Sequence, residues 1–246
     1  MDIATTIREA KEKVIREYCS AHGIEYDENM PADERARIIE EYSKEADRRR
    51  EEETKRLREE KRKRQEAEML LRKQREYEEW VNSSVPKRYR EAKKEDFKNT
   101  VSDLFSFEQS ALILGANGIG KSHLGWAIAK EAKKVGKTVS YVSMFYLMSE
   151  VKKAKEWIDV IMKYSTEDIL IIDEMDKCIA SESDFVIISE IVGKRYNDML
   201  PTIVIGNGTE QDAQRIIGQS AYSRLTGDGG KLYCLNGVDR RRIKTN

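Results

Sequence analysis

No stretch of this sequence is long and apolar enough to span a membrane, and its first residues do not resemble a signal peptide. Cysteine is scarce, because the chain holds only Cys19, Cys178 and Cys234, an odd number without the spacing of metal ligands. This scarcity argues against a disulfide framework and favours a reducing compartment. An excess of charge of one sign is also missing, since 45 basic and 45 acidic side chains balance. We expect a soluble cytoplasmic protein without strong global attraction to nucleic acid, although a local basic patch can still bind it.

The composition changes along the chain and predicts three parts. We expect a helical N-terminal domain over residues 1–43, a charged helical linker over 44–81 and the main domain over 82–246. In the linker, Glu recurs four residues from Lys or Arg, which supports a helix. The first half of the linker lacks the apolar a and d positions of a coiled coil. Pro86 then disfavours helical geometry at the residue before it, so the linker helix ends there.

The N-terminal domain is predicted to hold two short helices. The first covers residues 2–22 and carries one apolar stripe, formed by Ile3, Ile7, Ala10, Val14 and Tyr18. The second starts near Pro31, and its inner face consists of Ala36, Ile39 and Tyr42 or Ala46. Two short helices bury little surface by themselves, so they form a small hairpin or a surface for a partner, and packing within the chain explains most of these positions.

The motif that organises the main domain is a phosphate loop of the form GxxxxGK[ST]. It consists of Gly115, Ala116, Asn117, Gly118, Ile119, Gly120, Lys121 and Ser122. An apolar run over residues 111–114 predicts a buried strand before the loop, and helical spacing of apolar residues from His123 onward predicts a helix after it. The glycines let backbone N–H groups turn toward a phosphate at the helix N-terminus. Lys121 would reach the β- and γ-phosphates, and Ser122 would bind Mg²⁺.

Strands alternate with helices after the phosphate loop. Further strands are expected over residues 138–142, 168–174, 201–207 and 231–235, and helices over residues 146–157, 185–198 and, in short pieces, 212–225. Strands that are apolar almost throughout predict a parallel sheet covered by helices on both faces, which is an α/β fold. Ligands of such folds bind at the carboxyl ends of the strands.

Acidic and amide side chains end two of these strands. Asp173 would hold Mg²⁺ through water, and Glu174 would orient and polarise the water that attacks the γ-phosphate. Asn207 has the chemistry to hold that water or to sense the γ-phosphate; the other interpretation is a turn-forming asparagine before Gly208. Arg224 lies just beyond a short helix, where a neighbouring subunit could receive it as an arginine finger; the other interpretation is a surface arginine.

Residues from about 82 to 246 resemble the DnaC/IstB group of AAA+ ATPases, especially its loaders of replicative helicases. The resemblance rests on Val85-Pro86-Lys87-Arg88-Tyr89-Arg90, GANGIGKSHL, Tyr141-Val142 with Phe145-Tyr146-Leu147-Met148, ILIIDEMDK, Pro201-Thr202, Ser223-Arg224-Leu225 and the ending Leu235-Asn236-Gly237-Val238-Asp239-Arg240. One departure is at Met199-Leu200-Pro201, where the group usually has an arginine before the proline. The interface role of that arginine is therefore in doubt for this chain.

The resemblance implies an AAA+ sheet of five strands in 51432 order, with ATP bound together with Mg²⁺ and hydrolysed at subunit interfaces. The site residues that it implies are Lys121 and Ser122 as Walker A, Asp173 and Glu174 as Walker B, Asn207 as sensor 1, Arg224 as the finger, and the phosphate loop through His123 as nucleotide contacts. Arg240 is assigned the sensor 2 role, for which the adjacent Arg241 and Arg242 are alternatives.

The implied partners are a hexameric replicative helicase of the DnaB type, bound by the N-terminal helices, together with single-stranded DNA and further copies of this chain. Candidates for DNA contact are Phe145, Tyr146, Lys152, Lys153 and Lys155, through base stacking and phosphate pairing; alternatively, the two aromatic side chains only pack their helix onto the sheet. We expect no membrane partner, and a source in a bacterial cell or a phage. Two other functions stay open: an IstB-like transposition helper ATPase that binds duplex DNA, and an ATP-gated adaptor with little hydrolysis.

Overall fold

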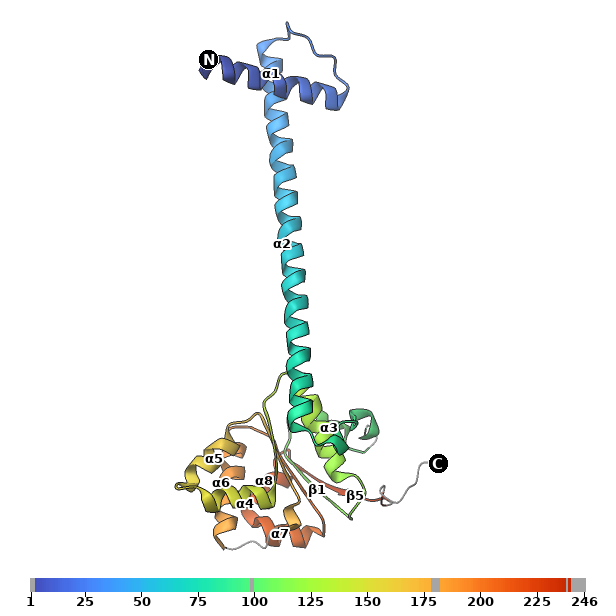
Figure 1. Cartoon of the computed structure of the whole chain (residues 1–246), viewed down its shortest axis with the longest axis vertical. Coiled ribbons are helices and arrows are strands. Elements are labelled where there is room, and N and C mark those ends of the chain that lie inside the picture. The colour runs from blue at the N-terminus through green and yellow to red at the C-terminus, as the bar shows by residue number, and fades with distance from the viewer. Residues whose placement is uncertain (1–2, 98–99, 178–181, 238, 240–246) are drawn as a thin grey trace. The chain divides into compact units, whose positions relative to one another are not determined.

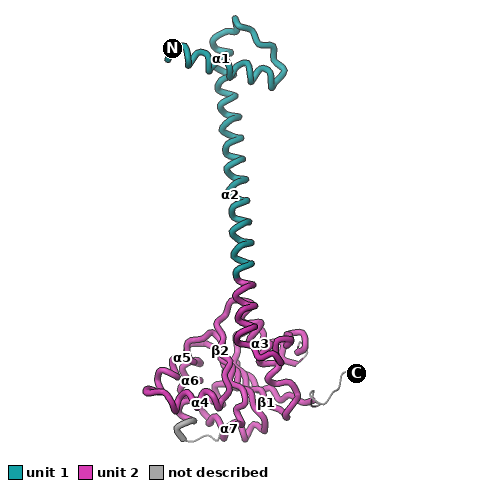
Figure 2. The backbone as a smooth tube through the Cα atoms, viewed as in Figure 1, with its two compact units in different colours: residues 1–72 teal, residues 73–246 magenta. Residues whose placement is uncertain are grey.

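The computed structural model describes residues 3–97, 100–177, 182–237 and 239. Contacts divide the chain into two compact units, residues 1–72 and residues 73–246 (Figure 2). Helix α2 (Ala32–Ser84) contributes residues to both units and continues through the positions where the predicted linker begins and ends. The division into three parts therefore stays a prediction.

The first unit is a helical hairpin with a small core of its own. It consists of α1 (Ile3–His22) and the first part of α2. Its buried side chains are Ile15, Tyr18, Cys19, Met30 and Ile38, with Tyr26, Ile39 and Tyr42 packed against them. The Tyr18 hydroxyl also donates a hydrogen bond to a Glu41 carboxylate oxygen, 2.5 Å away, which joins the two helices.

The apolar stripe predicted for α1 is wrong along most of its length. Ile3 and Ile7 are 77% and 51% exposed, whereas Ile15 and Cys19 are buried. The physical reason is that, among the described residues, the core shared with α2 takes side chains only from the C-terminal half of α1, so Ile3 and Ile7 lie outside it. On α2, the predicted Ala36 is exposed as well, and the buried residue is Ile38.

The second unit is built on a parallel sheet of five strands (Figure 1). The strands are β1 (Ala111–Gly115), β2 (Val139–Ser143), β3 (Ile169–Asp173), β4 (Thr202–Gly206) and β5 (Lys231–Leu235). Their order in the sheet is β2-β3-β4-β1-β5, which confirms the predicted 51432 order. All strands therefore present their carboxyl ends at the same edge of the sheet.

The helices of this unit largely follow the expected alternation. They are α3 (Lys121–Lys134), α4 (Met144–Lys153), α5 (Trp157–Ser165), α6 (Glu182–Asn197), α7 (Glu210–Ile217) and α8 (Gln219–Thr226), with short 3₁₀ turns η1 (Lys87–Tyr89), η2 (Lys94–Phe97), η3 (Ser102–Ser106) and η4 (Met175–Lys177). The single helix predicted over residues 146–157 is wrong, because Ala154 is extended and separates α4 from α5. No Gly or Pro marks that break in the sequence. Within the described part of the chain, no helix combines the length and apolar character needed to cross a membrane.

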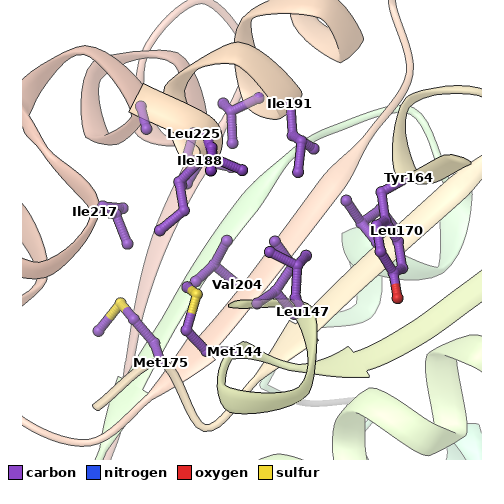
Figure 3. Close-up of a cluster of buried hydrophobic side chains, with 14 of the residues drawn as sticks. Met144, Leu147, Tyr164, Leu170, Met175, Ile188, Ile191, Val204, Ile217 and Leu225 are labelled. Carbon is purple, nitrogen blue, oxygen red and sulfur yellow. The ribbon is translucent and has the colours of Figure 1, made fainter. Parts of the chain in front are cut away.

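Alternating residues of the central strands face two separate cores. Leu112, Leu170 and Val204 point to the face covered by α4 to α8 (Figure 3). Their neighbours Ile113 and Ile171 point to the opposite face, which α3 and the segments before β1 cover. Because successive side chains of a strand alternate between faces, strands that are apolar throughout require this double cover.

A fully buried arginine joins the ends of three elements on the side of the sheet away from the phosphate loop. Arg195, in the last turn of α6, has no solvent exposure. Its guanidinium donates to Thr202 Oγ1 at 2.9 Å and to the carbonyl oxygens of Tyr164 at 3.1 Å, Glu167 at 2.7 Å, Asp168 at 3.3 Å and Pro201 at 2.8 Å. Burial lowers the pKa of Arg195 to about 10, so the side chain remains a cation at neutral pH. Arg195 thus fixes the end of α5 and the starts of β3 and β4.

We expect Arg195→Met to lower the free energy of unfolding of the second unit by about 3 kcal/mol or more, because several buried acceptors lose their donor at once. Tryptophan fluorescence during urea denaturation measures this unit selectively, since all three tryptophans, Trp80, Trp126 and Trp157, belong to it. Lys194→Met, at the neighbouring exposed position, is the matched control and should change the stability by about 0.5 kcal/mol or less. Equal losses in the two variants would contradict the role of Arg195.

Candidate nucleotide-binding site

A cavity of about 440 Å³ lies at the carboxyl ends of β1, β3 and β4. It is lined by residues of the loop after β1, the start of α3 and the 3₁₀ turn η1. The ends of β3 and β4 and the segments that follow them complete the wall. The lining residues are Arg88, Tyr89, Asn117, Gly118, Gly120, Lys121, Ser122, His123, Asp173, Glu174, Asp176, Lys177, Gly206 and Asn207. The structure thus brings the phosphate loop, the two strand-terminal carboxylates and Asn207 together around one space.

The phosphate loop connects β1 directly to α3. Gly120 is the residue before the first turn of α3 and has a φ of 107°, a conformation that favours glycine. Gly120 has no side chain with which to cap the N-terminus of α3. The dipole at the start of a helix favours a negatively charged ligand there.

Lys121 lies at the centre of the site. Only 8% of this residue is exposed. Its Nζ atom donates to the carbonyl oxygens of Gly115 at 2.8 Å and Ala116 at 2.7 Å, and to Asn207 Oδ1 at 2.6 Å. The lysine therefore joins the predicted phosphate loop to the residue at the end of β4.

Asp173 is held from two sides at the end of β3. Its Oδ2 atom accepts a hydrogen bond from the Tyr141 hydroxyl at 2.6 Å, and its Oδ1 atom accepts one from the Glu174 N–H at 2.7 Å. The same hydroxyl lies 3.5 Å from the Ser122 carbonyl oxygen. Burial, reinforced by the charge and hydrogen bond of Asp173, raises the pKa of Tyr141 well above its ordinary value, so this hydroxyl is a neutral donor. The Asp173 carboxylate and the Ser122 side chain offer oxygen atoms, which are the ligands that Mg²⁺ prefers.

Glu174 adopts a backbone conformation that is unusual for its residue type. Its φ is 56°, in the left-handed region, and its side chain is exposed while it lines the cavity. Such a conformation costs a non-glycine residue of order 1 kcal/mol and is found most often at functional sites. The turn directs the chain away from β3 immediately after Asp173.

Asn207 is bound by a carboxylate that the sequence analysis did not single out. The Asn207 N–H donates to Asp176 Oδ1 at 2.9 Å, and Asn207 Nδ2 donates to Asp176 Oδ2 at 2.7 Å. Burial by itself would raise the pKa of Asp176, but these two hydrogen bonds, together with a hydrogen bond to its own backbone and the charge of Lys177, leave that pKa below its ordinary value. Asp176 is therefore an anion near neutral pH. The side chain of Asn207 joins Asp176 to Lys121.

The remaining predicted residues occupy different positions. His123 lines the cavity, and its ring centroid lies 6.0 Å from that of Tyr89. Arg224 is in α8, its guanidinium lies against Gly193 of α6, and it does not line the cavity. Arg240, with its alternatives Arg241 and Arg242, lies outside the described residues.

The segment before β1 is attached to α3 by a buried lysine. Lys130 Nζ donates to the carbonyl oxygen of Ala92 at 2.9 Å and also to that of Arg90. The ring of Tyr89 packs over Trp126, whose own ring stacks on Tyr141 at 3.9 Å between centroids. These contacts place Tyr89 at the cavity wall and connect it to the tyrosine that binds Asp173.

Sequence reasoning missed the cavity residues Arg88, Tyr89, Asp176 and Lys177. A signal was present for Asp176, which follows Asp173 by three residues in a polar run at the end of a strand. Tyr141 carried no such signal, because a tyrosine within a strand is ordinarily a packing residue.

The phosphate loop, the strand-terminal Asp-Glu pair, the asparagine after the next strand and the strand order define a P-loop nucleotide-binding protein with the AAA+ fold. The family described as IstB-like ATP binding protein matches residues 32–221. The chain belongs to this family, as the resemblance to the DnaC/IstB group predicted.

Several curated relatives are bacterial helicase loaders. The chain is similar to the replicative helicase loader DnaC of Escherichia coli K12, with 28% identity over 121 residues that cover 47% of this chain and 49% of that protein. It is also similar to DnaC of Buchnera aphidicola subsp. Baizongia pistaciae, with 29% identity over 134 residues, or 52% of this chain and 51% of that protein. The chain thus spans about half the length of the curated relatives it matches.

Solved structures agree on the fold. A crystal structure of the DnaC helicase loader matches with a TM-score of 0.53 and 19% identity, over 61% of this chain and 100% of that chain. A replication initiator DnaA bound to AMPPCP and single-stranded DNA matches with a TM-score of 0.52 and 23% identity, over 65% of this chain and 53% of that chain.

We expect Tyr141→Phe to raise the Mg²⁺ concentration needed for nucleotide binding by about tenfold, because residues that orient a metal-binding carboxylate typically change metal affinity by about 10–100-fold. The effect is measured by titrating Mg²⁺ at a constant concentration of a fluorescent ATP analogue. Tyr164→Phe removes a buried hydroxyl that donates to Glu150 at 2.8 Å, remote from the cavity, and is the matched control. An unchanged Mg²⁺ dependence in Tyr141→Phe would show that this hydroxyl does not position Asp173.

Proposed function

We propose that this chain is an ATP-driven loader that places a hexameric replicative helicase of the DnaB type on single-stranded DNA. The observation that carries the proposal is the cavity in which Lys121, Asp173, Glu174 and Asn207 meet, in a chain whose relatives are named as helicase loaders. Membership of an ATP-binding family supports ATP as the nucleotide.

ATP hydrolysis in the proposed mechanism rests on positioning and charge. The N–H groups at the start of α3 and the Lys121 ammonium bind the phosphates. Ser122 and Asp173 hold Mg²⁺, which neutralises phosphate charge when bound. Glu174 orients the attacking water, and Asn207 lies beside Lys121 at the end of the neighbouring strand.

Arg224 is proposed to complete the site of a neighbouring copy. It lies outside the cavity of its own chain, as an arginine finger supplied across an interface would. Such a residue stabilises the charge that develops on the transferred phosphoryl group. Arg240 keeps the proposed sensor 2 role.

We expect Glu174→Gln to keep ATP binding while turnover falls by about 100-fold or more, because the amide cannot act as the base that polarises water. A steady-state phosphate-release assay and ATP-analogue binding measure the two quantities. Lys121→Ala is the contrasting control and should lose ATP binding itself.

The same phosphate-release assay, run on a mixture of variants, tests whether two copies of the chain share one site. Arg224→Ala mixed in equal amounts with Glu174→Gln should recover part of the activity, since some interfaces then combine an intact Glu174 with an intact Arg224. Full turnover in Glu174→Gln alone would exclude Glu174 as the residue that orients water, and an inactive mixture would argue against a shared site.

The proposed DNA contact lies at the N-terminal end of α4. Phe145 and Tyr146 are 66% and 58% exposed, which supports a contact with a ligand over packing of α4 onto the sheet. Lys152 and Lys153 in the last turn of the same helix, with Lys155 beyond it, add positive charge. A helix that carries exposed aromatic rings and lysines suits single-stranded DNA, because bases stack on the rings without any sequence readout.

The proposed helicase contact is in the first unit. The N-terminal half of α1 exposes Ile3 and Ile7, which lie outside the described hydrophobic core of the unit. An apolar stripe on a helix can dock into a groove of a partner protein. The charged segment of α2 over residues 48–65 is exposed at every position.

A loading assay with purified components tests the function. The full chain is incubated with the hexameric DnaB-type helicase of the same genome and circular single-stranded DNA, and helicase on DNA is quantified after gel filtration. We expect ATP-dependent loading, reduced about tenfold or more by the pair Phe145→Ala and Tyr146→Ala, since each lost stack weakens DNA binding by about 1–3 kcal/mol.

The paired substitution of Ile158 and Met162, exposed apolar residues of α5, by Ala is the matched control and should leave loading unchanged. Absence of a complex with the helicase, together with ATP-dependent binding of duplex DNA, would favour the transposition helper instead. Helicase binding without measurable turnover would favour the ATP-gated adaptor.

A further inference from the structure

Asp176 is placed beside Asn207 by packing that leaves little freedom. Met175, its neighbour in η4, is fully buried in the core that α4 to α8 cover (Figure 3). A Cβ atom at Gly206 would come within 2.7 Å of the Met175 Cε atom and 3.0 Å of its Cβ atom, so the end of β4 packs closely on Met175. Asp176 follows Met175 and faces Asn207, the residue after Gly206.

The partners of Asn207 determine which way its amide group points. An ionised carboxylate only accepts hydrogen bonds, and a lysine ammonium only donates them. Asp176 lies on one side of the amide at 2.7 Å and Lys121 on the other at 2.6 Å. The NH₂ group must therefore face Asp176, and the oxygen must face Lys121 and the phosphate side of the site.

This orientation favours the first of the two roles that the sequence left open for Asn207, that of holding the attacking water. An amide oxygen can accept a hydrogen bond from an attacking water or from Lys121. One of the two N–H bonds of the NH₂ group is directed to Asp176. The backbone N–H of Asn207 binds the second oxygen of Asp176 at 2.9 Å, so the carboxylate holds the residue at two points.

We propose that Asp176 is a positioning residue for ATP hydrolysis, which fixes Asn207 so that its amide oxygen faces Lys121 and accepts a hydrogen bond from the attacking water. This inference rests on the proposed ATPase function and deepens it. Asp176 acts entirely through Asn207 and requires no contact of its own with the nucleotide.

The decisive substitution is Asp176→Asn, which keeps the shape of the side chain. An amide at position 176 has one acceptor oxygen for the two donors of Asn207, so one donor stays unmatched or the Asn207 amide reverses. We expect kcat to fall about tenfold or more, because misplacement of a water-orienting group affects the transition state most strongly. The dissociation constant for ATP should change by less than about threefold, since the groups that bind the phosphates are retained.

The split between kcat and binding distinguishes positioning from a simple effect of charge. If Asp176 acted only through its negative charge, its removal would tighten ATP binding and leave kcat unchanged, and that result would overturn the inference. Asp198→Asn, on the exposed end of α6, removes one negative charge far from the cavity and is the matched control. Both variants should keep the wild-type midpoint in urea.

A second measurement is independent of turnover. The side-chain NH₂ signals of Asn207 in a ¹H–¹⁵N spectrum can be assigned by their loss in Asn207→Asp. They should shift in Asp176→Asn and stay in place in Asp198→Asn. Unmoved signals would overturn the inference whatever the kinetics. A wild-type chain without turnover, but with the expected shift, would instead overturn the proposed ATPase function and leave the orientation of Asn207 intact.

Discussion

The parallel sheet imposes the constraint on which the rest of the second unit depends. Between their end residues the central strands β1, β3 and β4 are apolar, so both faces must be covered and a polar side chain is not accommodated in the middle of these strands. Polar residues are therefore confined to the strand ends. Because all strands run in the same direction, the ends that carry Asp173 and Asn207 meet at one edge, beside the phosphate loop.

At that edge, a few charged side chains with little solvent exposure lie next to groups that compensate their charge, either an opposite charge or a hydrogen-bonding polar group. Lys121 and Asp173 are 8% and 7% exposed. Asn207 lies between the Lys121 cation and the Asp176 anion, and Tyr141 supports Asp173 from the edge strand β2. Hydrogen bonds to charged groups are stronger than neutral ones, so this arrangement is held in place before any phosphate arrives. A preorganised site of this kind suits a reaction that depends on positioning rather than on covalent chemistry.

Features that depend on local sequence signals were predicted better than features that depend on contacts between distant segments. The strands were predicted well, because a continuous apolar run and a phosphate loop are local signals with few competing structures. Their order followed from the resemblance to the DnaC/IstB group. The face that α1 buries was predicted wrongly, since helical spacing identifies an apolar stripe but not the length over which a partner covers it. The break between α4 and α5 was missed because nothing local in residues 153–157 interrupts a helix.

The sequence by itself determined the fold class, the phosphate loop and the residues Lys121, Ser122, Asp173, Glu174 and Asn207 as candidates at the strand ends. Only the tertiary structure decided which neighbours these residues have. Tyr141 and Asp176 act on Asp173 and Asn207 through contacts between residues more than thirty positions apart, and Arg195 stays buried only because backbone oxygens from three elements converge on it. Periodicity and motifs describe one segment at a time, whereas a buried polar contact depends on two segments and the packing that brings them together.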